Sequence, residues 1–252
     1  TGSVSALNYA YKIIGIVVSV VCGSMTTLLY PELSKLSAEK EWKKLSVKSE
    51  EALSALGMIL VPVVIVVFVF SKDIVKILFG RGNFGENAII RTSIALLCYA
   101  VAIIGIGLRD IMVKLFCSMQ NTRVPMVNGT ICAGLNIVLD IILIRMIGFR
   151  GAAIATALAA VFGAFNMIRI ARKKEIITLN RFYPNLLKNI IGGGMIYIFM
   201  YLSKKLLEKT YDFGITYLGL CSLIILIAVA IYFLSQVLLK NEILGRFLAR
   251  KR

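Results

Sequence analysis

The chain contains no histidine, one tryptophan and four prolines among its 252 residues. The absence of histidine excludes imidazole acid–base catalysis, histidine-ligated zinc and the zinc-protease motif H-E-x-x-H. No pair of carboxylates has the D-D-x-x-D spacing that would hold magnesium and pyrophosphate in a membrane prenyltransferase. No G-x-S-x-G or P-loop motif is present either. We therefore expect a protein that is not an enzyme and that holds neither a cofactor nor a metal.

The cysteines form no redox or metal-binding pattern. All lie in or at the ends of apolar stretches, and no pair has C-x-x-C spacing. In such surroundings cysteine behaves as a small buried hydrophobic residue. The five are Cys22, Cys98, Cys117, Cys132 and Cys221.

Hydrophobic residues are abundant: they make up 59% of the chain and give a mean hydropathy of +0.86. The apolar segments are hydrophobic on all sides for about 20 residues, the length that crosses a bilayer. We predict an all-α, polytopic membrane helix bundle with about seven transmembrane helices. The predicted spans are residues 4–30, 52–70, 88–117, 124–147, 152–168, 186–202 and 215–238. The glycine-bounded turn at 148–151 predicts a tight antiparallel pair of the fourth and fifth spans.

The basic residues are distributed unevenly between the two sides of these spans. The net charge of +16 does not indicate nucleic-acid binding, because the lysines and arginines sit in short loops. Nineteen of the 29 lie by the loops after spans one, three and five or in the C-terminal tail, against eight on the other side. Since positive loops stay in the cytoplasm, we expect the C-terminus inside and Thr1 outside. A start outside without a signal sequence predicts the C-terminal portion of a longer, transporter-like protein.

Residues 31–50 combine a proline at a helix-start position with apolar residues among lysines and glutamates. The apolar residues are Leu33, Leu36, Trp42 and Leu45. This pattern predicts an amphipathic helix on the cytoplasmic surface or, equally, a solvated connecting helix.

The first span carries a lysine among apolar residues, and Lys12 is the main candidate functional residue. Ser5, Asn8, Lys12, Gly15 and Ser19 recur at spacings of three and four, which places them on one helix face. A buried cation costs roughly 2.5–3.5 kcal/mol on insertion scales and survives beside water, a counter-charge or a polar ligand. We interpret the face as the lining of a wet cavity in which Lys12 contacts an anionic substrate. The alternative is small-residue packing, with Lys12 reaching the outer interface.

Other charged residues of the spans have structural interpretations as well. Arg91 lies near the outer start of the third span, where anchoring at the interface is expected. Asp140 has Asn136 one turn before it and Arg145 five residues after it, so a polar cluster that holds helices together is favoured over a proton-coupling site. Adjacent Arg109 and Asp110 do not face each other on a helix, and we expect them to mark the cytoplasmic interface or, as the alternative, to pair with other spans.

Several segments resemble the MurJ/MviN family of lipid II flippases. Residues 2–12, GSVSALNYAYK, are similar to the start of that family's eighth transmembrane helix, typically G-S-V-S-x-x-x-Y-A-x-R, and residues 29–34, LYPELS, to its end. Residues 78–84, LFGRGNF, resemble the loop after the next helix, and residues 116–125, FCSMQNTRVP, resemble the family segment F-Y-x-x-x-D-T-x-x-P. Lys12 stands where the family has a cavity arginine, and Ser5 matches a nearby serine.

The resemblance implies helices eight to fourteen of a two-lobed transporter of the MOP superfamily in the bacterial plasma membrane. Residues 1–175 would form most of the C-terminal lobe, and residues 176–252 an extra pair of spans with a cytoplasmic tail. The implied function is export of an undecaprenyl-pyrophosphate-linked peptidoglycan precursor by alternating access. The implied partners are this anionic lipid-linked substrate, membrane lipids and the protein's own N-terminal half. Alternatives are another MOP exporter of a polyprenyl-linked saccharide or drug, and a polytopic enzyme acting on lipid-linked sugars.

Overall fold

The computed structural model describes residues 2–82, 84–239 and 241. These residues fold into seven helices, and no strand occurs among them. Each helix is long and apolar enough to cross a membrane, which confirms the predicted all-α fold class. The helices are α1 (Gly2–Ala38), α2 (Trp42–Phe79), α3 (Glu86–Ser118), α4 (Arg123–Ile147), α5 (Phe149–Lys173), α6 (Phe182–Thr210) and α7 (Ile215–Leu238).

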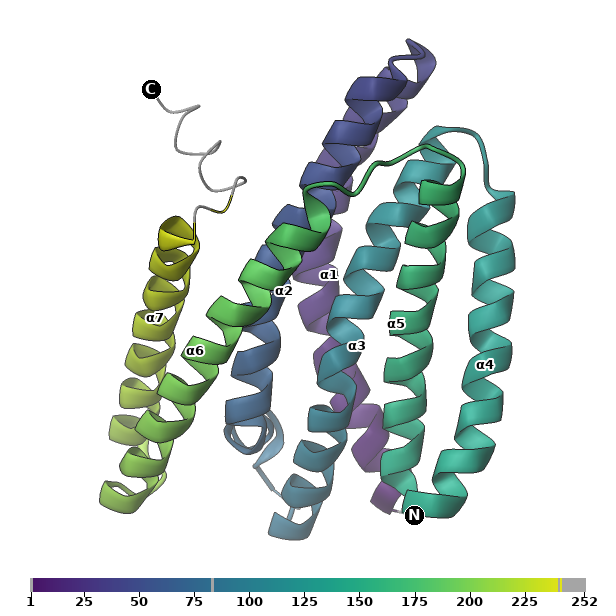
Figure 1. Ribbon diagram of the computed structural model, residues 1–252. Helices are drawn as coiled ribbons and strands as arrows, with labels where there is room; N and C mark the ends of the chain where they lie inside the picture. Colours follow the sequence, from purple (N-terminus) through teal and green to yellow (C-terminus); the bar gives the residue numbers. More distant parts are fainter. Residues whose placement is uncertain (1, 83, 240, 242–252) are drawn as a thin grey trace.

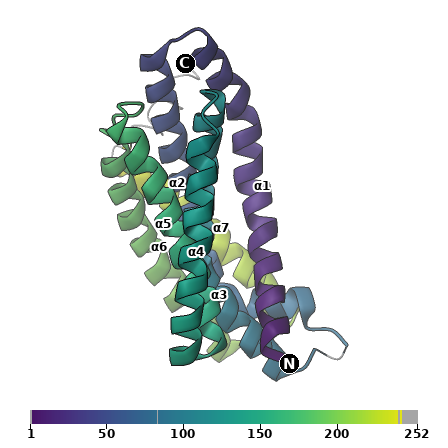
Figure 2. The same ribbon diagram turned by 90° about the vertical axis from the view of Figure 1, so that its right-hand side faces the viewer.

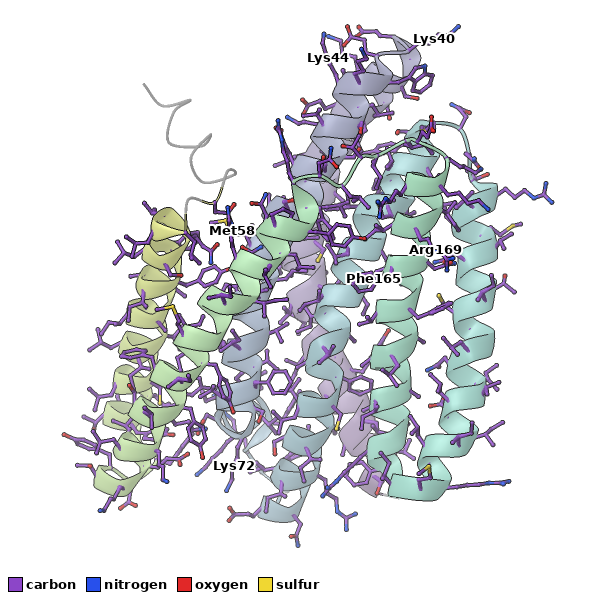
Figure 3. The ribbon with its side chains drawn as sticks, in the orientation of Figure 1. Lys40, Lys44, Met58, Lys72, Phe165 and Arg169 are labelled. Atoms are coloured by element: carbon purple, nitrogen blue, oxygen red, sulfur yellow. The ribbon has the colours of Figure 1, made fainter. Side chains whose placement is uncertain are left out.

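The end of α1 and the start of α2 form a helical hairpin over residues 31–50 that projects beyond the other helices (Figure 1). With 37 and 38 residues, these helices are about 55 Å long, well above the ~30 Å of a hydrocarbon core. Of the two alternatives for this segment, the amphipathic helix lying on the membrane surface is wrong, because residues 31–50 continue α1 and α2. Leu33 and Leu45 are buried between the two arms, and Lys48 pairs with Glu32 across them at 2.8 Å. The apolar side of the segment thus packs on its partner arm, with Lys40 and Lys44 near the tip (Figure 3).

The main hydrophobic core lies where α3 packs against α1, α2 and α5 (Figure 1). The α3–α5 crossing is close, because a Cβ added at Gly105 would lie 2.6 Å from the backbone of Ala160. Small residues also fill the inner face of α5, which lets neighbouring helix backbones approach. They include Ala153, Ala155, Ala157, Ala160, Gly163 and Ala164.

The fourth and fifth helices form the tight antiparallel pair that the sequence predicts. Gly148 joins them with a φ of 66°, a left-handed conformation that glycine adopts without steric cost. A Cβ at Gly151 would lie 2.3 Å from the carbonyl of Leu143, so the helices meet with almost no separation. The helix α4 packs almost only on α5, and its other faces are exposed.

The pair α6–α7 packs on α2, on the side away from α4 and α5 (Figure 1). A second hydrophobic cluster joins these three helices through Met58 and Val61 of α2, Met200 of α6 and Tyr232 of α7. Because α2 belongs to both clusters, it connects the α6–α7 pair to the rest of the bundle. The C-terminal tail expected after residue 241 lies outside the described residues.

Candidate functional site

The helix α1 runs along one edge of the bundle (Figure 2). The polar face expected on it is exposed. Ser5, Asn8 and Lys12 all point away from the helix's neighbours, as do Gly15 and Ser19 farther along. The opposite face of α1 is buried against α2 and α3. Its buried residues there are Ala6, Ala10, Ile13 and Ile14. The helix therefore separates an apolar packing side from a side where polar groups are available to a ligand.

Lys12 contacts an aromatic ring and no carboxylate in the part of the chain that the structure describes. Its Nζ lies 5.7 Å from the centre of the Tyr9 ring, within the range of a cation–π contact. That ring packs against Phe79 and Phe84 with centroid distances of 4.7 and 5.4 Å. The packed aromatic rings hold the lysine side chain in place. Its positive charge has no salt-bridge partner among the described residues.

Arg91 lies in the second turn of α3 and is exposed, beside the start of α1. One of its guanidinium nitrogens is 3.6 Å from the position that a Cβ of Gly2 would occupy. Lys12 is ten residues farther along α1, or about 15 Å at the rise of an α-helix. Arg91 therefore sits at the very end of the bundle, where interface anchoring stays our prediction.

A polar contact between α4 and α5 lies one turn from Asp140. Asn136, one turn earlier on α4, donates a 3.5 Å hydrogen bond to Thr156 of α5. Tyr99 on α3 lies beside Thr156, and its ring centroid is 5.7 Å from that of Tyr11 on α1. Asp140 itself forms no ion pair with Arg145, and its Oδ1 is buried without a hydrogen-bond partner among the described residues, so its part in a polar cluster stays a prediction.

A second polar layer joins α4 and α5 nearer the hairpin end. Asn128 donates to the carbonyl of Gly163 at 3.2 Å and accepts from Asn166 at 2.8 Å. The Cδ of Arg109 lies 3.6 Å from the Cβ position of Gly163, so this arginine points toward α5. The sequence did not identify this layer, because two asparagines 38 residues apart give no local spacing signal.

Three further polar contacts were also missed by sequence reasoning, all at the α6–α7 pair. Glu50 binds the start of α6, and Lys204 of α6 binds Asp73 of α2. Asn241 donates to Asn189 and Gln236 at 3.1 and 2.9 Å. Glu50 and Asp73 follow or precede charged loops, where carboxylates are usually solvated, so nothing local marks them as buried.

The described residues contain no group of three histidine, cysteine, aspartate or glutamate side chains that could hold a metal ion. Their five cysteines are all free thiols. The chemistry available along α1 is thus that of a cation and neutral hydrogen-bonding groups. Such a set can bind an anion.

Comparisons with known proteins agree on one family. The profile described as lipid II flippase MurJ matches residues 1–251. A probable lipid II flippase MurJ of Rhizobium tropici is 28% identical over 267 residues, covering 100% of this chain and 48% of that protein. A probable lipid II flippase MurJ of Bdellovibrio bacteriovorus is 25% identical over 238 residues, covering 94% and 45%. The chain thus spans about half the length of these curated relatives.

A solved structure described as lipid II flippase MurJ in an inward closed conformation has the same fold. It superimposes with a TM-score of 0.78 at 22% identity, covering 96% of this chain and 48% of that one. At this identity the likeness supports the fold alone. The family profile, in contrast, matches almost every residue, and from it we conclude that the chain belongs to the MurJ family of lipid II flippases.

Proposed function

We propose that the complete protein to which this chain belongs moves lipid II across the bacterial plasma membrane. Membership of the MurJ family supports this function, and the exposed polar face of α1 is the observation in this chain that carries it. A flippase needs a polar path for the headgroup and apolar surfaces for the polyprenyl tail. The α1 face offers the first, and the exposed hydrophobic residues of the other spans offer the second.

In this proposal Lys12 attracts the pyrophosphate, while Ser5 and Asn8 hydrogen-bond to phosphate or sugar oxygens. An ammonium acts as a point charge, in contrast to the planar fork of arginine that holds two oxygens at once. Transport requires that the headgroup bind differently in the inward- and outward-open states, because equal affinity shifts no equilibrium. That Lys12 has no salt-bridge partner among the residues that the structure describes supports a role in which the substrate supplies the counter-charge.

Arg91 and Asp140 have supporting roles in this proposal. Arg91 anchors the outer ends of α1 and α3 at the interface, and Asp140 keeps α3, α4 and α5 together through the polar layer around Thr156. The distribution of basic residues supports a cytoplasmic hairpin and a cytoplasmic C-terminus. The remaining half of the transport path belongs to residues outside this chain.

Replacement of Lys12 tests the site. We expect Lys12→Ala to abolish complementation of a flippase-depleted strain and Lys12→Arg to preserve it, since arginine keeps the charge. Lys205→Ala is the matched control, because Lys205 is exposed on α6 away from the polar face. Growth and membrane levels of each variant are measured together. Normal growth with Lys12→Ala at normal protein levels would remove Lys12 from the mechanism.

A second measurement separates transport from membrane enzymology. Vesicles containing the complete protein and labelled lipid II are expected to show loss of label from one leaflet with its chemical structure intact. Covalent turnover of the lipid in the same vesicles would favour an enzyme acting on lipid-linked sugars and contradict the proposal.

A further inference from the structure

The inference concerns the contact between α2 and α6, which run side by side in the same direction (Figure 1). Near the end of α2 opposite the hairpin, Phe70 has non-helical angles, φ −108° and ψ 19°, which kink the helix. Lys204 of α6 enters this kink. Its Nζ donates to the carbonyl of Val69 at 2.8 Å and lies 2.6 Å from a carboxylate oxygen of Asp73. At a kink the helical hydrogen bonds of the backbone are interrupted, so the lysine supplies a donor where the helix lacks one.

The charged contact between Lys204 and Asp73 is largely buried, and it includes residues of α2, α6 and α7. The side chains of Lys204 and Asp73 are 12% and 11% exposed. The hydroxyl of Tyr217 on α7 donates to the other oxygen of Asp73 at 3.2 Å. The ammonium also lies 5.2 Å from the Phe70 ring centre and 3.5 Å from Glu208. A buried ion pair is strongly destabilised when one partner is lost, because the other charge is left uncompensated.

The opposite end of the contact is held by a carboxylate. Glu50 of α2 is 3% exposed. One of its oxygens accepts the backbone N–H groups of Arg181 and Phe182, and the other accepts the Thr178 hydroxyl at 3.1 Å. These N–H groups begin α6, where the helix dipole favours a negative charge. Glu50 thus caps a helix that starts 132 residues later in the chain.

Between these ends the two helices approach closely. A Cβ at Gly193 of α6 would lie 2.7 Å from Val61 and 3.0 Å from Ile65 of α2. The two polar contacts also agree in register: they are 23 residues apart on α2 and 22 apart on α6. Parallel helices that advance equally between two fixed points cannot slide along each other without breaking one of them.

We propose that α2 and α6 form a permanently closed seam, with Lys204 as its positioning residue. The α6–α7 pair then moves with α2 as one body whenever the protein changes conformation. The seam does not open to admit a lipid chain, and any lateral entrance on this side lies elsewhere. This proposal holds whatever the transported headgroup is.

Cross-linking across the seam tests the proposal in an otherwise unchanged contact. Val61→Cys and Gly193→Cys are combined in the complete protein after the native cysteines are replaced, because a Cβ at Gly193 would lie 2.7 Å from Cγ1 of Val61, so the two side chains face each other across the contact. We expect the oxidised pair to complement a flippase-depleted strain as well as the reduced pair and each single variant. Growth that stops on oxidation and returns with reductant would overturn the closed seam. If the oxidised pair, the reduced pair and both single variants all fail to support growth, the substitutions themselves are harmful. The proposal is then tested by distances between spin labels.

The distance measurement uses labels at Phe68 of α2 and Leu226 of α7, both exposed to the surroundings of the bundle. The complete protein is expected to give one narrow distance, unchanged by added lipid II. Lys204→Met is expected to broaden or split it, and Lys204→Arg to restore it, since arginine keeps the donor and the charge. Lys205→Met is the control that leaves it unchanged. A distribution that is already split in the unaltered protein, or unaffected by Lys204→Met, would overturn the proposal.

Discussion

Lys12 is exposed on α1 and has no carboxylate partner among the described residues, whereas Lys204 is largely buried against one. Lys204 has Asp73 and a carbonyl, whereas Lys12 has only the face of Tyr9 within the part of the chain that is described. The sequence pattern predicted that Lys12, Asn8 and Ser5 share a face, since three- and four-residue spacing fixes this in any helix. It did not predict the partners of Lys204 or Glu50, because those lie 131 and 132 residues away along the chain.

The Glu50 cap has a stability consequence. Glu50→Ala removes the acceptor of the N–H groups of Arg181 and Phe182 and of the Thr178 hydroxyl, and the buried Phe182 N–H left unsatisfied costs about 1–3 kcal/mol. We expect a clearly lower melting temperature of the purified complete protein in detergent. Glu39→Ala serves as the control, because Glu39 lies at the exposed hairpin tip and forms only a 3.9 Å pair with Lys35. Equal melting temperatures for both variants would show that the cap contributes little.

At the scale of helices, hydropathy located every span but not every helix end. The predicted spans of α4 and α7 agree with the structure to within one residue, because glycine or polar residues end both helix and apolar run there. The ends of α1 and α2 were missed by eight to ten residues. In the hairpin the apolar run stops while helix-forming lysine, glutamate and leucine continue, and burial of Leu33 and Leu45 stabilises the extension.

The closeness of α3 to α5 makes Gly105 sensitive to a single methyl group. In Gly105→Ala the new Cβ would lie 2.6 Å from the α5 backbone, which cannot rotate away as a side chain can. We expect destabilisation of about 1–3 kcal/mol, typical of overpacking. Thermal unfolding is compared with Gly194→Ala, where no atom lies within 4 Å of the new Cβ. If the Gly105→Ala and Gly194→Ala variants have the same melting temperature, α3 and α5 are farther apart at Gly105 than in this structure.

At the scale of the whole chain, orientation in the membrane is open to direct measurement. The proposed topology places the hairpin tip in the cytoplasm and the α6–α7 connection outside. In a cysteine-free complete protein, we expect Asp212→Cys to react with a membrane-impermeant maleimide in intact cells. Lys40→Cys should react only after permeabilisation, since it lies near the hairpin tip (Figure 3). The reverse pattern of labelling would invert the topology, and with it the side from which Lys12 is reached.

The α2–α6 contact also bears on how the protein is made. Glu50 and Asp73 leave the ribosome 131 to 132 residues before Phe182 and Lys204. At about 5–20 residues per second, this delay is roughly 7–26 s. During this delay the partners of Glu50 and Asp73 on α6 have not yet been synthesised. During synthesis there is therefore an interval in which the two carboxylates of α2 lack their final partners. Until α6 is made, water at the bilayer surface, the insertion machinery or a chaperone has to solvate or bind them.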